Sequence, residues 1–174
     1  MQLKQRAKAF FEASIQPFTT ITTALQNSGI DYAVCGCIIR PKALLPYFYE
    51  IPAAAELFHT GNRDTIKLLD QLFKLYPTAN ALRYVPSLPK MDAGATLKDA
   101  VDFLGLDNQP VYVYYLRYAP VLQLQLYRLL SANAGDLFNR QQGDVVIFPT
   151  DLSWLIAYAL ETEWYAGRYA ETNS

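Results

Sequence analysis

The spacing of apolar residues predicts a long amphipathic helix at the start of the chain. Apolar side chains recur three, four and seven positions apart from Leu3 to Leu25, which places them along one face of a helix. The pattern ends near Gly29. Pro17 lies inside it, and because proline removes a backbone hydrogen bond we expect a kink or a restart of the helix there.

A strand and a group of short helices are expected next. Residues 32–39 form a short apolar run with β-branched members, which indicates a strand. Prolines then divide a region of short helices. Asn62 can cap a helix that continues to about Tyr76, and Pro77 ends it. We interpret the proline-containing stretch 79–91 as an irregular connection.

The middle of the chain alternates between helix and strand. Thr96 begins a helix of the capping-box type, and Gly105 suits its end. Residues 111–118, rich in Val and Tyr, give the strongest strand pattern of the chain. Pro120 suits the first turn of a helix, because leucines follow it at helical spacing. Residues 144–148 predict another strand.

The last segment fits two different structures. Thr150 can cap one long helix, or residues 154–160 and 163–169 can be two strands joined by a tight turn. The aromatic and isoleucine content favours the hairpin, whereas the alanine content favours the helix. With helices early and strands late, we expect an α+β fold in which N-terminal helices pack on a mostly antiparallel sheet with a C-terminal hairpin.

Composition restricts the class of protein. The chain has 174 residues, 52% of them apolar, which suits one domain over 1–174 and excludes a disordered chain. A pI near 5.8 argues against nucleic-acid binding through bulk charge. The longest uncharged run is too polar to span a membrane. The only cysteines, Cys35 and Cys37, are too close for an unstrained bridge, which favours a reducing, cytoplasmic location.

Charge is divided unevenly along the chain. Residues 1–90 carry ten basic and six acidic side chains, a net +4, whereas residues 91–174 carry five basic and ten acidic ones, a net −5. An acidic half can steer a basic partner, although the same charge also suits an ordinary solvated face. Thirteen tyrosines either supply rigid contact surface or fill the core with their hydroxyls reaching solvent.

Residue types that carry catalysis are sparse. His59 is the only histidine, and it stands in a turn-like stretch where exposure is favoured over catalysis. On a strand, Cys35 and Cys37 would point to one face. Zinc would need two further ligands besides them, so both are expected to be small buried hydrophobes. We therefore predict no metal site and no cofactor.

Two carboxylate pairs are candidates for acid–base chemistry. They are Asp99 with Asp102, on a predicted helix, and Glu161 with Glu163, beside the predicted turn. Such a pair can act as acid and base when one member is desolvated. Both positions are typical of solvated charge, so we predict no catalytic residues.

Residues 29–37, Gly-Ile-Asp-Tyr-Ala-Val-Cys-Gly-Cys, resemble the opening of small nucleotidyltransferase domains, where a helix leads into a strand and a glycine turn. That resemblance implies a pair of metal-binding aspartates shortly afterwards. Residues 38–52 offer only Glu50, and Cys37 interrupts the glycine pair. A nucleotidyltransferase-like enzyme or a hydrolase is accordingly the least favoured alternative.

A second resemblance covers the C-terminal third. This segment contains Asp151, Ser153 and Trp154, followed by Glu-Trp-Tyr-Ala-Gly from residue 163. It resembles the closing segment of small bacterial immunity proteins of polymorphic toxin and contact-dependent systems. In those families a strand is followed by a short helical turn, then by a strand that begins with Ser-Trp, and then by a final hairpin. Members commonly carry a histidine near the hairpin turn, where this chain has Leu-Glu-Thr. The resemblance implies the hairpin and a toxin-neutralising function.

We therefore expect a non-enzymatic cytoplasmic protein that binds a protein partner, such as a bacterial toxin, and neither nucleic acid nor membrane. The predicted contact residues come from the acidic C-terminal region: Asp144, Asp151, Glu161, Glu163 and Trp164. Trp164 is either a desolvated anchor or core, with core slightly favoured. The alternative function is a structural or homo-oligomeric interaction module that uses the Tyr-rich strand 111–118.

Overall fold

The structure is a computed structural model that describes most of the chain. The described residues are 2–37, 42–58, 62–77, 88–116, 120–131, 137–139, 143–159 and 163–169. His59 and Glu161 lie outside them, as does most of the connection predicted at 79–91. The N-terminal helices are α1 (Leu3–Asn27), η1 (Lys42–Leu44), α2 (Leu45–Tyr49), α3 (Pro52–Phe58) and α4 (Asn62–Leu75).

The long N-terminal helix α1 continues through Pro17 as one element, so the expected restart does not occur. Its buried face contains Phe18, Ile21 and Leu25, as the apolar spacing predicted. The rings of Phe10 and of Phe48 in α2 pack edge to face, with 5.9 Å between the ring centroids. Packing along this face holds the helix together across the position where proline removes a hydrogen bond.

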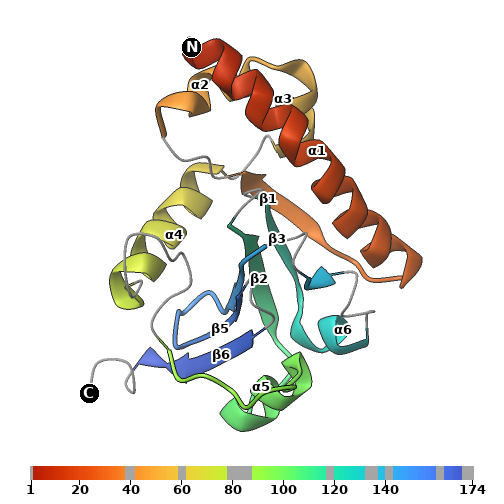
Figure 1. Ribbon diagram of the computed structural model, residues 1–174, viewed down its shortest axis with the longest axis vertical. Helices are drawn as coiled ribbons and strands as arrows, with labels where there is room; N and C mark the ends of the chain where they lie inside the picture. The colour runs from red at the N-terminus through yellow and green to blue at the C-terminus, as the bar shows by residue number, and fades with distance from the viewer. Residues whose placement is uncertain are drawn as a thin grey trace.

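A six-stranded antiparallel sheet forms the rest of the fold, in the order β1-β3-β2-β4-β5-β6. Figure 1 shows the N-terminus and α1 to α3 at one end of the molecule and α5 at the other. This is the α+β class that the order of elements predicted. The remaining elements are β1 (Ala33–Cys37), α5 (Leu97–Leu104), β2 (Pro110–Tyr115), β3 (Pro120–Gln125), α6 (Leu126–Ser131), β4 (Val145–Phe148), β5 (Trp154–Ala159) and β6 (Glu163–Arg168).

The helix predicted from Pro120 is wrong for its first six residues. Residues 120–125 form β3, and only 126–131 are helical, as α6. Leu122 pairs with Val113 of β2 and with Val34 of β1, so β3 lies inside the sheet. Pairing with two neighbouring strands outweighs the helical spacing of the leucines, since tertiary contacts override local propensity.

The C-terminal hairpin is confirmed. β5 and β6 pair in antiparallel register from Trp154 opposite Arg168 to Ala159 opposite Glu163. Every residue of β5 is buried, which accounts for its unbroken apolar run. The alanines that made a helix conceivable, Ala157, Ala159 and Ala166, are buried in the core.

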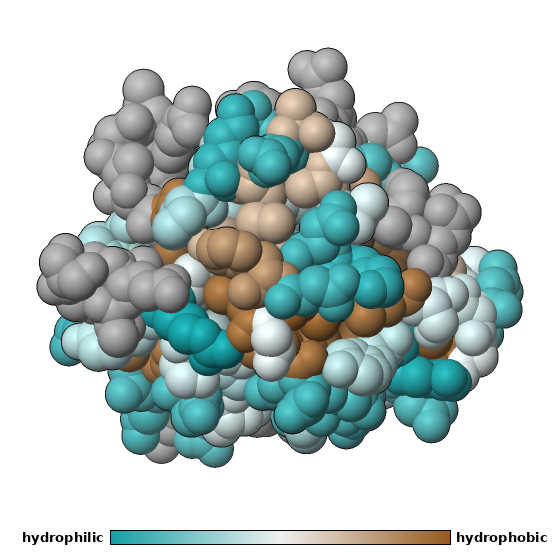
Figure 2. Space-filling view, turned by 90° about the horizontal axis from the view of Figure 1, so that it is seen from below, coloured by the Kyte–Doolittle hydropathy of each residue, from teal (hydrophilic) through white to brown (hydrophobic). Residues whose placement is uncertain are grey.

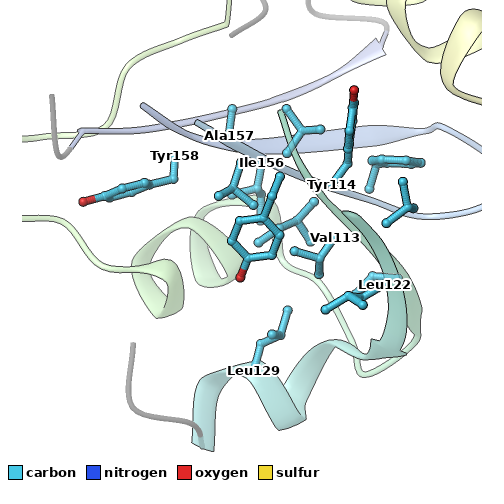
Figure 3. Packing of buried hydrophobic residues seen from close by; sticks show 14 of the residues in the cluster. Val113, Tyr114, Leu122, Leu129, Ile156, Ala157 and Tyr158 are labelled. Atoms are coloured by element: carbon cyan, nitrogen blue, oxygen red, sulfur yellow. The ribbon is translucent and has the colours of Figure 1, made fainter. Parts of the chain in front are cut away.

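Helices and connecting segments cover both faces of the sheet. Cross-strand pairing places Val113, Leu122 and Ile156 on one face, and Leu129 of α6 lies against that side (Figure 3). On the opposite face, the ring of Tyr114 meets Phe73 of α4 at 6.4 Å. The resulting core is continuous from α1 to β6.

The two outer strands of the sheet are covered. On β1, the hydroxyl of Thr65 donates a 2.9 Å hydrogen bond to the carbonyl of Cys35, next to a bulge in the strand. On β6, the Met91 amide donates to the Trp164 carbonyl at 2.8 Å, and the Ala166 amide donates to the Pro89 carbonyl. The backbone groups bonded in this way are not available for pairing with another chain.

Candidate functional site

The predicted contact residues do not form one surface. Glu163 begins β6 opposite the end of β5, and Asp144 directly precedes β4 at that same end of the sheet. Asp151 lies in the loop between β4 and β5, at the opposite end. A six-residue strand separates the two ends by about 20 Å. Asp151 and Glu163 therefore cannot both contact one small binding site on a partner.

Glu163 is engaged within the protein. Its carboxylate lies 2.7 Å from the ammonium of Lys90 and accepts a 2.9 Å hydrogen bond from the Tyr165 hydroxyl. The hydrogen bond and the charge of Glu163 raise the pKa of Lys90. Residues 89–91 are joined to β6 by backbone hydrogen bonds, and Lys90 in this segment partly neutralises the negative charge of Glu163.

Trp164 belongs to the core, as was slightly favoured. It is 6% exposed, and its ring meets Tyr158 at 4.9 Å and Phe138 at 5.1 Å. A side chain packed in this way supplies area to the fold and is not available as an interfacial anchor.

The Asp-x-Ser-Trp motif has a local structural explanation. Asp151 is exposed, and its carboxylate accepts hydrogen bonds from the Ser153 hydroxyl at 2.7 Å and from the Ser153 amide at 3.0 Å. These bonds lower the pKa of Asp151. The turn directs Trp154 into the core, where it is 2% exposed. The motif therefore shapes the entry to β5.

The Tyr-rich strand is not an exposed interface. β2 lies between β3 and β4, and Tyr114 and Tyr115 are each 1% exposed. The Tyr115 hydroxyl donates to the buried Leu137 carbonyl at 3.1 Å, and burial raises its pKa. Tyr112, which is half-buried, stacks on Phe148 at 5.5 Å. The described tyrosines of this strand are mainly core, which contradicts their proposed use as an oligomer surface.

A different surface presents both charge and an aromatic ring, and it is centred on α5. Thr96 and Asp99 form a complete capping box at its start, as the sequence predicted, and Gly105 ends it in the left-handed conformation. Leu97, Ala100, Val101 and Leu104 are buried. The opposite side of the helix carries Phe103, which is 59% exposed, the highest value among the large hydrophobic side chains of the described residues.

Three exposed carboxylates lie within four residues of Phe103 along the chain. Asp99 and Asp102 are exposed on the same helix, and Asp107 is exposed just beyond its end. Asp92 and Asp99 line a shallow hollow of about 380 Å³ beside the start of the helix. We call the set Asp92, Asp99, Asp102, Phe103, Asp107 and Tyr127 the α5 face.

Tyr127 extends this surface onto α6. It is 44% exposed, and its hydroxyl donates a 2.9 Å hydrogen bond to the Leu106 carbonyl, which fixes it beside the end of α5. Figure 2 views the molecule from this end: apolar surface gathers in the middle of the view and is bordered by hydrophilic groups. Lys98 is the basic residue of α5, and it pairs with Asp102 at 2.7 Å.

One feature of the sequence pointed to this surface. The inward spacing of Leu97, Val101 and Leu104 left Phe103 off the buried side of the helix. A large apolar residue on the solvent side of a well-capped amphipathic helix is the informative exception to its pattern.

Within the described ranges, no three His, Cys, Asp or Glu side chains are arranged to hold a metal ion. Cys35 is half-buried, and burial raises the pKa of its thiol, which disfavours the reactive thiolate. The alternation of a regular strand predicted that Cys35 and Cys37 point to one face, but a bulge at residues 34–36 interrupts that alternation. The side chain of Cys37 is not among those that the structure describes.

The helices that the structure describes include none that is long and apolar enough to cross a bilayer. Comparisons with protein-family models, with curated proteins and with solved structures find no match to this chain.

Proposed function

We propose that this chain is a non-enzymatic protein-binding protein of the cytoplasm that neutralises a basic protein toxin, in the manner of an immunity protein. The observation that carries the proposal is the gathering of exposed carboxylates on the α5 face. Asp92, Asp99, Asp102 and Asp107 are all exposed there. An immunity protein needs fast and tight association rather than chemistry, and acidic surfaces accelerate association with basic partners.

The net charge of the whole chain does not oppose this function. Although the chain is close to neutral, its charge is separated along its length. Lys4, Arg6 and Lys8 are exposed at the start of α1, at the end of the molecule opposite to α5 (Figure 1). A separated charge distribution orients an approaching basic protein toward the acidic end.

The function is testable in cells. Each reading frame adjacent to the gene would be expressed in a laboratory bacterial strain with and without this chain, and growth would be recorded. We expect one product to stop growth, this chain to restore it, and the purified pair to form a complex. If no neighbouring product is toxic, or if the toxic product is not neutralised, the immunity function is wrong.

A further inference from the structure

We infer that Phe103 is the anchor of a protein-binding site on the α5 face, and that this site fits a partner surface with a small apolar pocket ringed by lysine or arginine side chains. The inference rests on the proposed function, which it makes specific by locating the contact on α5 instead of on the C-terminal hairpin. The partner belongs to one class, a basic folded protein.

Exposure of Phe103 is not explained by the fold. The buried side of α5 already packs on the sheet through four residues, and Phe103 is not among them. At 59% exposure it leaves apolar ring surface in contact with water, which is unfavourable in proportion to the exposed area. A ring that a partner covers would regain that free energy, and aromatic residues are enriched among interface anchors.

The helix that carries Phe103 is held firmly in place. The capping box satisfies both the Thr96 amide and the Asp99 amide, with distances of 2.8 and 3.3 Å to their side-chain acceptors. At the other end, the guanidinium of Arg168 donates to the Leu104 carbonyl and ties α5 to β6. A ring on a fixed helix loses less conformational freedom on binding than a ring on a loop.

Charge identifies the chemistry of the partner. The α5 face carries four aspartates against Lys98, which already pairs with Asp102. A second copy of the same face would bring like charges together, and a nucleic acid or an anionic membrane would be repelled. A basic protein surface is the complement.

The first experiment locates the contact in living cells. A photo-reactive phenylalanine analogue would replace Phe103 in the full chain, produced in its native host, and Gln16, exposed near the middle of α1, would be the control position. We expect position 103 to crosslink to a basic protein other than a second copy of this chain, and position 16 to crosslink to none. Absence of a crosslink at 103, or equal crosslinking at both positions, overturns the inference.

The second experiment uses the crosslinked protein in purified form. We expect Phe103→Ala to weaken its affinity by about tenfold or more, and Phe103→Leu to recover part of that loss. Both variants should keep the thermal stability of the parent chain, because the side chain is mainly in water. An unchanged affinity for Phe103→Ala overturns the inference, even when the toxin-neutralising function is confirmed.

A matched pair of charge variants separates local from global electrostatics. Asp102→Lys/Asp107→Lys reverses two charges on the α5 face, and Glu12→Lys/Glu56→Lys makes the same net change on exposed positions of α1 and α3. We expect only the first pair to slow association, by about tenfold at low salt and less at high salt. Equal slowing by both pairs would mean that net charge acts without a site on α5, and would overturn the inference.

Discussion

The hydroxyl of Tyr76, just beyond the end of α4, donates a 2.8 Å hydrogen bond to the backbone carbonyl of Leu152 in the loop between β4 and β5. Leu152 adopts a φ of 60°, the one positive φ among non-glycine residues in the described ranges. A left-handed backbone costs a residue with a side chain about 1 kcal/mol. Burial, with the nearby charge of Asp151, raises the pKa of Tyr76 to about 12, so its hydroxyl stays protonated and able to donate.

Removing this hydroxyl should destabilise the fold. In Tyr76→Phe the buried Leu152 carbonyl loses its donor, and we expect the free energy of unfolding to fall by about 1–2 kcal/mol. Tyr127→Phe is the matched control, because the Tyr127 hydroxyl also donates to a carbonyl, but its side chain is 44% exposed and water replaces the lost bond more easily. Urea denaturation measures both. Equal losses would show that the Tyr76 bond has no special structural role.

Substitutions of Leu152 should reverse the usual order of alanine and glycine. Both changes remove a side chain that is 2% exposed, and each should cost about 2–4 kcal/mol. Glycine adopts a positive φ without strain. We therefore expect Leu152→Gly to be at least as stable as Leu152→Ala, and more stable by up to about 1 kcal/mol. Thermal and urea unfolding of the two variants compare them, and a clearly more stable alanine variant contradicts the strain.

Trp164 and Phe103 should separate stability from binding. We expect Trp164→Ala to lower the free energy of unfolding by about 3–5 kcal/mol, since its ring packs against Tyr158 and Phe138. Phe103→Ala should change it by no more than about 0.5 kcal/mol. Urea denaturation at neutral pH tests the contrast. Comparable losses in both variants would place Phe103 in the fold rather than on a surface.

The turn at Asp151 should make part of the stability depend on pH. Because hydrogen bonds from Ser153 lower the pKa of folded Asp151, their contribution is present above the ordinary aspartate pKa, near 4, and is lost as the pH falls through the lower folded value. At pH 7 the free energy of unfolding of Ser153→Ala should therefore be lower than that of the parent, by roughly a few tenths of a kcal/mol because the group is exposed. The difference should shrink below about pH 3.

A serine without a carboxylate partner provides the control. Ser131 donates to the Arg128 carbonyl at 2.8 Å, so any loss in Ser131→Ala should not vary between pH 7 and pH 3. NMR titration of the Asp151 carboxyl follows the pKa directly, and we expect it to rise in Ser153→Ala. A Ser153→Ala variant whose stability loss is the same at both pH values contradicts the linkage.

The sequence predicted those elements whose signals are local. The capping box at Thr96 and Asp99 uses contacts within one turn, and the glycine at 105 ends the same helix. β3 was missed because its strand character depends on β1, which pairs with it across almost ninety residues of chain. A leucine such as Leu122 fits a helix or a strand equally well until its neighbours in space are known.

The α5 face was not among the sites predicted from the sequence. The predicted contact region was the acidic C-terminal part of the chain, which includes Glu163, and Trp164 was slightly favoured as core. No local pattern shows that Lys90, more than seventy residues earlier, neutralises Glu163. Burial of Trp164 likewise depends on Phe138, which the sequence does not place beside it. Phe103 could be recognised only by its position off the buried side of its own helix.

The position of β1 at the margin of the sheet has a consequence for how the chain assembles. The strands from β2 to β6 lie within residues 110–168 and join largely through hairpins between neighbours in sequence, which close quickly because their loops are short. Val34 pairs with Leu122, so β1 can join the sheet only after most of the polypeptide has been synthesised. During synthesis on the ribosome, we therefore expect the amphipathic α1 to emerge long before the core that includes its apolar face is complete, which makes the early nascent chain a candidate client for chaperones that shield exposed hydrophobic segments.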